Sequence, residues 1–233
     1  MKDTEFLKLS LISNRGIYDN ENVFENTLEA MKAAIDKNYA IYLSVQYTKD
    51  GVVVVYHDHD LTRLMNLKDK IVSTTYEELQ FLCSYHIPTL AQALELIAGR
   101  VPVIINPRNR DLKYYLPKEL AKILDEYNGK FAILNENATI IKWFNKYRPN
   151  YIVGEVITKH KKGFYDIGNF LANYSIVTDF KSVNIKNNDP HKTRSIKDKS
   201  IVVAYLVDNM DKYRQYKLVC DNLIIDNVNE LDI

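Results

Sequence analysis

Apolar runs of strand length alternate along the chain with segments of helical spacing, and this alternation restricts the fold more than any other feature. The runs are, in chain order, LKLSLIS, AIYLSVQYT, VVVVYH, VPVIIN, KFAILN, YIVGEVIT, YSIVTDF, SIVVAYLV and NLIID. Strands that are apolar nearly throughout are typical of a parallel sheet covered on both faces. Regular β-then-α order gives right-handed crossovers between such strands. The pattern therefore predicts an α/β fold.

Several connecting segments show the period of an amphipathic helix. Examples are ENTLEAMKAAIDK, TLAQALELIAG, LPKELAKILDEY and TIIKWFNKY. One face of the first collects Leu28, Met31, Ala34 and Ile35. The second segment has Thr89 as an N-cap and Gly99 as a C-terminal stop. We expect these segments to be helices that cover the sheet.

Eight β/α units fit the chain, so we predict that residues 1–233 form one (β/α)8 barrel. A length of 233 residues with 46% hydrophobic residues suits a barrel of one domain. An open doubly wound sheet is the alternative, but no GxGxxG or P-loop motif follows any strand. The stretch 181–200 is expected to be a mobile loop, because it is rich in charge and poor in apolar residues.

The charges are nearly balanced, with 31 Lys and Arg against 30 Asp and Glu and a formal net charge of +1. No block of like charge indicates a nucleic-acid partner or a membrane-surface tail. The start MKDTEFLKLSLI has early acids and neither a long apolar run nor a small-residue cleavage site. Neither a signal peptide nor a membrane span is therefore predicted, and a cytoplasmic location is expected.

Polar residues gather at the ends of the predicted strands, and in a barrel these ends meet at one mouth where chemistry takes place. They are Asn14, Arg15, Tyr42, Ser44, His57, Asp58, Asn106, Arg108, Asn135, Glu155, Asp179, Tyr205, Asp208 and Asp226. We expect Asn14 and Asp226, which end the first and last strands, to lie on adjacent strands. The mouth is thus the predicted functional site.

One long run resembles a known family. SNRG…FENTLEAMKAAIDKNYAIYLSVQYTKDGVVVVYHDHDLTRL is similar to the signature of glycerophosphodiester phosphodiesterases, HRG…PENTLEAF…A…G…IELDVQLTKDGVPVVFHD..L.R. The similarity continues through IPTLAQALELI, VPVIINPRN and VVAYLVDN…VCDNLIIDNV, so it covers almost the whole chain. It implies a TIM barrel of the phospholipase C-like phosphodiesterase type. It also implies kinship with phosphoric diester hydrolases of lipid metabolism.

The resemblance implies roles for single positions at the mouth. Family members use two histidines as acid and base; the second matches His57, while the first falls on Asn14. The basic residues that contact phosphate in the family match Arg15 and, with Lys replaced by Arg, Arg108. His57 is either a surviving catalyst or a residue merely hydrogen-bonded within the HD turn.

The family's metal ligands are the second set of implied positions. A Glu and an Asp on the second strand and a Glu on the third strand fall on Tyr42, Ser44 and Asn106. A neutral phenol, hydroxyl and amide give Mg²⁺ or Ca²⁺ little reason to shed water. No metal or other cofactor is therefore expected. Mg²⁺ or Ca²⁺ is the alternative if the site is rebuilt from other carboxylates, namely Glu155, Asp179 and Asp226.

Loss of the acids leaves a mouth expected to be net positive. Arg15 and Arg108 offer planar forks of donors that suit phosphate, sulfate or carboxylate. We expect both to converge on one anion. The alternative is that each arginine pairs with a nearby carboxylate, again Glu155, Asp179 or Asp226.

Three functions remain open from the sequence. The first is a catalytically inactive relative that binds a small anionic or phosphorylated ligand, or a partner protein, at the mouth. The second is a working phosphodiester hydrolase or lyase that uses His57 with a rebuilt site. The third is a structural barrel without a ligand. A deficit of about 10⁴-fold or more in the family reaction is expected from the lost groups.

Overall fold

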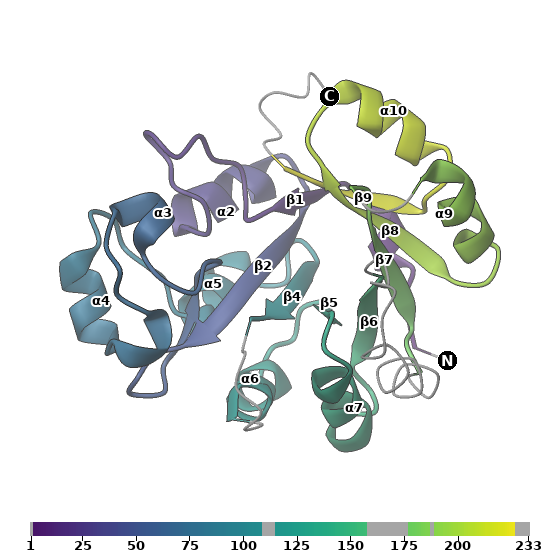
Figure 1. The fold of residues 1–233 in the computed structure, drawn as a ribbon. Coiled ribbons are helices and arrows are strands. Elements are labelled where there is room, and N and C mark those ends of the chain that lie inside the picture. Colours follow the sequence, from purple (N-terminus) through teal and green to yellow (C-terminus); the bar gives the residue numbers. More distant parts are fainter. Residues whose placement is uncertain (1, 109–114, 158–176, 187–188, 227–233) are drawn as a thin grey trace, which may run out of the picture.

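The computed structural model describes residues 2–108, 115–157, 177–186 and 189–226 (Figure 1). The strands are β1 (Ile12–Asn14), β2 (Ala40–Tyr47), β3 (Val53–Val55), β4 (Val103–Pro107), β5 (Phe131–Asn135), β6 (Ile152–Ile157), β7 (Phe180–Asn184), β8 (Ile201–Val207) and β9 (Asn222–Ile225). The helices are α1 (Phe6–Leu9), α2 (Leu28–Asp36), α3 (Thr62–Met65), α4 (Tyr76–Leu82), α5 (Leu90–Ile97), α6 (Tyr115–Asp125), α7 (Ala138–Tyr147), α9 (Pro190–Lys197) and α10 (Met210–Lys217), with a 3-10 helix at Ile71–Ser73.

Eight of the nine described strands close into a parallel barrel. Their order in the sheet is β1-β9-β8-β7-β6-β5-β4-β2-β3, and an additional parallel pairing of β1 with β2 closes the ring. The remaining strand, β3, forms an antiparallel hairpin with β2. Asn14 and Asp226 follow neighbouring strands, since β1 pairs with β9. The predicted (β/α)8 barrel is thus confirmed, and the open sheet is excluded.

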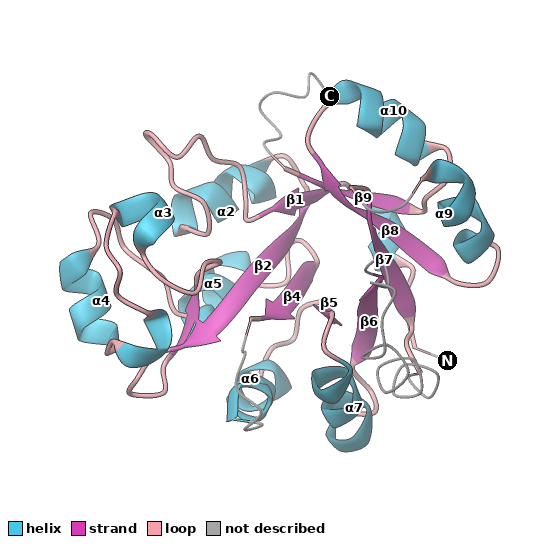
Figure 2. Ribbon diagram, in the orientation of Figure 1, coloured by secondary structure: helices cyan, strands magenta, loops and turns pink. Residues whose placement is uncertain are grey.

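Side chains alternate along each strand between the barrel interior and the helices outside. The interior layer comprises Phe6, Leu7, Ile12, Ala40, Tyr42, Ile104, Ala132, Leu134, Ile152, Phe180, Val203 and Ile224. A larger outer layer joins strand residues such as Leu43 and Ile105 to helix residues such as Met31 and Leu94. Figure 2 shows these helices around the outside of the strands. The expected amphipathic helices are therefore confirmed.

Local signals explain where α5 begins and ends. Thr89 caps the helix by accepting from Gln92 N, and Gln92 returns the contact to the Thr89 backbone in a capping box. The chain leaves the helix through two left-handed residues, Ala98 (φ 48°) and Gly99 (φ 71°). Both predicted boundaries of this helix are confirmed.

The N-terminal end of the barrel is closed by α1. Phe6 and Leu7 of this helix are buried in the interior layer. Asn222 at the start of β9 donates through Nδ2 to Leu7 O and Ser10 O, each at 2.7 Å. The expectation that LKLSLIS is one strand is wrong in its first half, because Leu7 packs inward as a plug while Leu9 turns to solvent.

The connection from β3 to α5 forms a small cap with its own core. This core contains Val54, Tyr56, Leu61, Ile71, Leu79 and Ile87, all buried. The cap carries the 3-10 helix together with α3 and α4, which lie beside the far end of β2 in Figure 1. The residues after β3 therefore belong to a packed unit and not to an open loop.

The seventh strand lies later in the chain than the sequence pattern suggested. YSIVTDF was expected to be this strand; its first three residues lie outside the described residues, and β7 starts at its last residue, Phe180. Pairing decides the position, because Phe180–Asn184 fits between β6 and β8 with Phe180 and Val183 buried.

The expected loop 181–200 is corrected in the same way. It contains the remainder of β7 and all of α9, while 187–188 lie outside the described residues. Its polar composition hid two buried anchors, Val183 on the strand and Thr193 on the helix. Whether this segment is mobile stays untested.

Gly154 of β6 provides a test of interior packing. A methyl group at this position would overlap the ring of the buried Phe180 on the neighbouring strand. We expect Gly154→Ala to lower the free energy of unfolding by about 1–3 kcal/mol, measured by urea denaturation. Combining it with Phe180→Leu should cost less than the sum of the two single changes. Additive costs would show that the two positions do not compete for the same space.

Candidate active site

Asn14 ends β1 and is held by the carboxylate at the end of β9. Its Nδ2 donates to Asp226 Oδ1 at 2.7 Å, and Tyr18 OH donates to the same oxygen at 2.8 Å. Burial, followed by the charge of Asp226, raises the pKa of Tyr18 well above its ordinary value, so its hydroxyl stays a donor. Asn14 is fully buried and positioned by a carboxylate, but its amide carries no titratable proton.

Arg15 turns into the site through a left-handed backbone conformation. Its φ is 66°, and its backbone N donates to Tyr42 O at 2.8 Å. Its Nη1 lies 2.9 Å from each oxygen of Glu25, a carboxylate that is 2% exposed. Arg15 thus pairs with Glu25, and the alternative that it pairs with Glu155, Asp179 or Asp226 is wrong.

A chain of alternating charges continues from Glu25 to His57. Arg63 of α3 donates to both Glu25 oxygens, with Nη2 at 2.7 Å from Oε1 and Nη1 at 2.9 Å from Oε2. Arg63 Nε also donates to Asp58 Oδ2 at 2.5 Å. The other oxygen of Asp58 lies 2.7 Å from His57 Nδ1. Three side chains, Glu25, Arg63 and Asp58, therefore connect the arginine after β1 to the histidine after β3.

The ionisation of this chain fixes the histidine tautomer. Burial opposes ionisation of Asp58, but the hydrogen bond with His57 and the charge of Arg63 outweigh it and lower the pKa of Asp58 to about 2. An ionised Asp58 only accepts, so His57 Nδ1 carries the proton and Nε2 is left unprotonated. Burial is the largest cause that lowers the pKa of His57, and the charges of Arg15 and Arg108 add to it, against Asp58.

Neutral groups line the opposite side of the mouth. Asn106 Nδ2 donates to Tyr42 OH at 2.6 Å, and Asn135 Nδ2 donates to Asn106 Oδ1 at 2.9 Å. Asn135 Nδ2 also donates to Pro107 O at 2.7 Å. Burial raises the pKa of Tyr42 far above its ordinary value, so the phenol stays neutral. Both polar atoms of the Asn106 amide are therefore engaged by neutral partners.

Two serine hydroxyls and a second tyrosine face the barrel interior near the hydrogen-bonded residues Tyr42, Asn106 and Asn135. Ser44 and Ser182 lie two residues beyond the inward-facing Tyr42 and Phe180, are fully buried, and have no hydrogen-bond partner for Oγ within the described parts of the chain. The ring of Tyr205 lies 5.6 Å from that of Tyr42. Burial raises the pKa of Tyr205, while the charges of Arg15 and Arg108 oppose the shift.

Arg108 follows β4 and keeps its guanidinium group available. Its backbone N donates to Val45 O at 2.9 Å. In the described ranges, its side chain makes no ion pair and no hydrogen bond. Because its charge acts on His57, Tyr42 and Tyr205, it lies on the same side of the barrel as Arg15.

Three carboxylates expected at the mouth lie elsewhere or are already paired. Glu155 occupies the outward parity of β6, between the inward positions 154 and 156, and its Oε1 lies 3.3 Å from Lys181 Nζ. Asp179 precedes β7 at the opposite end of the barrel, 2.7 Å from Lys2 Nζ. Asp208 lies 2.6 Å from Lys212 Nζ. Of the carboxylates considered for a rebuilt cation site, the structure brings only Asp226 to the mouth.

The positions of these side chains decide whether the mouth could hold a divalent cation. Among the described residues, no three His, Cys, Asp or Glu side chains are grouped so that they could hold a metal ion. Tyr42, Ser44 and Asn106 do come together, since Asn14 pairs with Tyr42 and Ser44 pairs with Asn106 in the sheet register. They offer a neutral phenol, a hydroxyl and an amide whose oxygen already accepts a hydrogen bond. This donor set does not fit Mg²⁺ or Ca²⁺.

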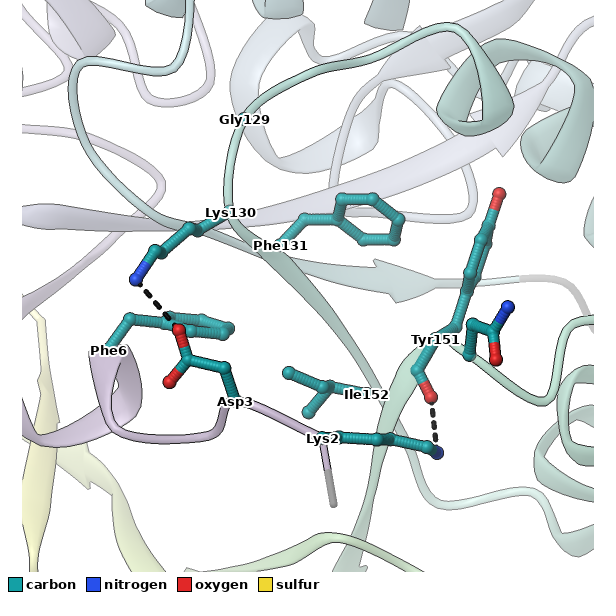
Figure 3. Close-up of a pocket in the computed structure, with 9 residues that line it drawn as sticks. Lys2, Asp3, Phe6, Gly129, Lys130, Phe131, Tyr151 and Ile152 are labelled. Atoms are coloured by element: carbon teal, nitrogen blue, oxygen red, sulfur yellow. Dashed lines mark hydrogen bonds and ion pairs between the residues drawn. The ribbon is translucent and has the colours of Figure 1, made fainter.

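A cavity of about 580 Å³ lies at the other end of the barrel, around the N-terminal segment. Figure 3 shows Lys130 bonded to Asp3 and Lys2 bonded to the Tyr151 carbonyl across it, at 3.0 Å and 2.6 Å. The N-terminal face of such barrels serves stability, and both lysines here are already paired. The mouth is therefore the better candidate for chemistry.

Glu25 and Arg63 are the site residues that the sequence interpretation missed. Both lie inside the quoted resemblance, Glu25 in FENTLEA and Arg63 in HDHDLTR. Neither ends a strand, so a search restricted to strand ends passed over them. Their motifs were the signal that would have identified them.

Comparison with known proteins places these observations in a family. Residues 15–230 match the Glycerophosphoryl diester phosphodiesterase family. A glycerophosphodiester phosphodiesterase of Caldanaerobacter subterraneus is 32% identical over 154 residues, or 60% of each chain, and one of Bacillus altitudinis is 32% identical over 127 residues, about half of each. The aligned part thus spans roughly 50–60% of the length of these two curated relatives.

Solved structures match over nearly the full length. A phosphodiesterase of Oleispira antarctica in complex with the product sn-glycerol-3-phosphate has a TM-score of 0.77 at 17% identity, covering 95% of this chain and 94% of the other. A glycerophosphodiester phosphodiesterase of Thermotoga maritima has a TM-score of 0.76 at 23% identity, covering 94% and 96%. At these identities the likeness shows the fold.

The described helices include none that is both long and apolar enough to span a bilayer.

Three observations agree on the family: the closed parallel barrel, the His57–Asp58 turn after β3 and the family match over residues 15–230. This chain belongs to the glycerophosphoryl diester phosphodiesterase family.

Proposed function

We propose that this chain is a catalytically inactive family member whose mouth binds a phosphorylated or otherwise anionic ligand. The observation behind this proposal is the neutral chain Tyr42–Asn106–Asn135, in which both Asn106 polar atoms are engaged. The resemblance places the family's metal ligands at Tyr42, Ser44 and Asn106, and those side chains do not fit a divalent cation. No catalytic step is therefore assigned to a metal here.

The proton chemistry is also incomplete in this proposal. The family's first histidine falls on Asn14, whose amide cannot transfer a proton and instead donates to Asp226. A positioned acid or base contributes about 10²–10⁴-fold to rate. His57 alone thus has no partner of the type that the family reaction uses.

Anion binding follows from the charges that remain. Arg108 has no ion pair in the part of the chain that the structure describes, and Arg15 Nε is buried without a hydrogen-bond partner there. A guanidinium group in a half-dry concave site is stabilised by an anion. The Oleispira antarctica phosphodiesterase, which has the same fold, was solved in complex with the product sn-glycerol-3-phosphate, and this supports a phosphorylated ligand.

A second candidate is a diester hydrolase or lyase with a rebuilt site. The observation that favours it is the His57–Asp58 pair at 2.7 Å, which leaves Nε2 unprotonated on a side chain that is 17% exposed. Hydrolysis of bis-(p-nitrophenyl) phosphate or glycerophosphocholine by the wild type, lost in His57→Gln, would favour this candidate. Rates near those of active family members would overturn the proposal of inactivity.

The first prediction concerns the sign of the charge that the mouth binds. Calorimetric titration should detect phosphate and sulfate binding but no Mg²⁺ or Ca²⁺ binding, because Arg108 and Arg15 face no cation ligands. Arg108→Ala should weaken sulfate binding about tenfold or more, since hydrogen bonds to charged groups contribute about 1.5–3 kcal/mol. Arg214→Ala on the exposed side of α10 removes the same charge and should have no effect. Binding of Mg²⁺ or Ca²⁺ without any binding of sulfate would refute the proposal that the mouth binds anions.

The second prediction concerns pH, with sulfate as a probe because it does not titrate in this range. The fold lowers the pKa of His57, so the imidazole is neutral at about pH 7 and becomes charged only as the pH falls further. In the free protein this shift contributes stability above the unfolded pKa that is lost at lower pH. Bound sulfate favours the protonated, charged form of His57. The affinity for sulfate should therefore increase as the pH is lowered from about 8 to about 5. A His57→Gln variant should lack the rise; a wild-type profile that is flat would exclude His57 from the anion site.

The third prediction tests inactivity by restoration. Asn14→His, Tyr42→Glu, Ser44→Asp and Asn106→Glu together should create a Mg²⁺ or Ca²⁺ site and measurable diesterase activity. The matched control carries the three acids but keeps Asn14; it should bind the cation and gain far less activity, because one proton donor is still missing. Absence of cation binding in both variants would show that surrounding residues have moved as well.

A further inference from the structure

We propose that Arg63 is the positioning residue of the mouth, coupling the orientation of His57 to that of Arg15. The inference rests on the proposed anion-binding function of this site. Arg63 contacts Asp58 and Glu25 at the same time, through Nε on one side and both Nη atoms on the other. Arg63 therefore acts on His57 through Asp58 and on Arg15 through Glu25.

The contact with Asp58 determines what His57 presents. Asp58 Oδ2 is bound to Arg63 and Oδ1 to His57, so the carboxylate plane is fixed by two partners at once. A fixed, ionised Asp58 holds the proton on Nδ1 and directs the basic nitrogen Nε2 away from itself. Without Arg63, Asp58 is free to rotate into solvent and His57 exchanges between its tautomers.

The contact with Glu25 determines what Arg15 presents. Glu25 is nearly inaccessible, and its two oxygens are shared between the guanidinium groups of Arg15 and Arg63. Sharing keeps Glu25 in one rotamer and engages Arg15 through Nη1, while Arg15 Nε stays buried without a hydrogen-bond partner among the described residues. Without Arg63, both Glu25 oxygens are free to pair with Arg15 alone. Glu25 can then change its rotamer and shift the Arg15 guanidinium group from its present orientation.

Geometry also explains why a residue of the cap performs this coupling. Arg63 lies on α3 of the cap, whereas Glu25 lies on the connection from β1 to α2. The same two segments meet a second time, where the rings of Phe24 and Tyr85 stack with centroids 4.2 Å apart. One contact is charged and reaches His57 and Arg15; the other is aromatic and holds the same interface without touching the charge chain.

This pair of contacts supplies the control for the experiment. Arg63→Met removes the guanidinium but keeps an unbranched side chain at a position that is 43% exposed. Phe24→Leu weakens the same interface through the stack only. A structural role for Arg63 predicts that both variants change the mouth alike, whereas a positioning role predicts that only Arg63→Met does.

The test reads out His57 directly by ¹⁵N-histidine NMR at about pH 7.5, above the ordinary histidine pKa, with the His57 signals assigned by their loss in His57→Gln. Wild type should show the Nδ1–H tautomer of His57. Arg63→Met should show a mixed tautomer and about tenfold weaker sulfate binding, as expected for loss of an orienting contact. Phe24→Leu should lower the melting temperature but keep the tautomer and the affinity. Arg63→Lys retains the charge without the fork, and should fall between the two.

Failure of this inference is distinguishable from failure of the proposed function. A wild type that binds no sulfate refutes anion binding, yet the tautomer still reports on Arg63. An unchanged Nδ1–H tautomer in folded Arg63→Met or, if that variant does not fold, in Arg63→Lys overturns the positioning role. Loss of the tautomer in Phe24→Leu as well would reduce Arg63 to an interface contact.

Discussion

A single buried carboxylate organises the mouth of this barrel. Glu25 accepts hydrogen bonds from two guanidinium groups, and burial alone would favour its protonated form. Hydrogen bonds and the positive charges of Arg63 and Arg15 outweigh that cost and lower the pKa of Glu25. The connection after β1 and the cap after β3 therefore depend on each other, since Arg15 has its ion pair among the described residues only with Glu25, and Glu25 in turn is held by Arg63.

The two sides of the mouth satisfy their buried polar groups in different ways. On one side, ionised groups alternate in sign from Arg15 to Asp58. On the other side, Tyr42, Asn106 and Asn135 satisfy one another as neutral donors and acceptors. A neutral amide chain needs no counter-ion, whereas carboxylates at those positions would repel one another without a cation. Three neutral groups together are thus electrostatically consistent in a way that one neutral group between two carboxylates would not be.

The sequence was sufficient for the fold, because continuous apolar runs and helical spacing identify buried parallel strands and their covering helices. It also placed His57, Asn106 and Asp226 near strand ends. It failed for Asp179 and Glu155, where one residue of register or parity decides which end or face a side chain occupies. Sequence spacing also gave no partner for Arg15, because Glu25 and Arg63 meet only where the connection after β1 packs against α3 of the cap.

The plug formed by α1 has a consequence for how the site exchanges its contents. With Phe6 and Leu7 packed in the interior layer and Asn222 holding α1 in place, side chains close the N-terminal end of the barrel. In the proposed function, a ligand therefore enters and leaves at the C-terminal ends of the strands, and a substituent on its anionic group extends away from α1. An anionic group attached to a solid support through such a substituent should therefore still be able to reach Arg15 and Arg108, if the proposed function is correct.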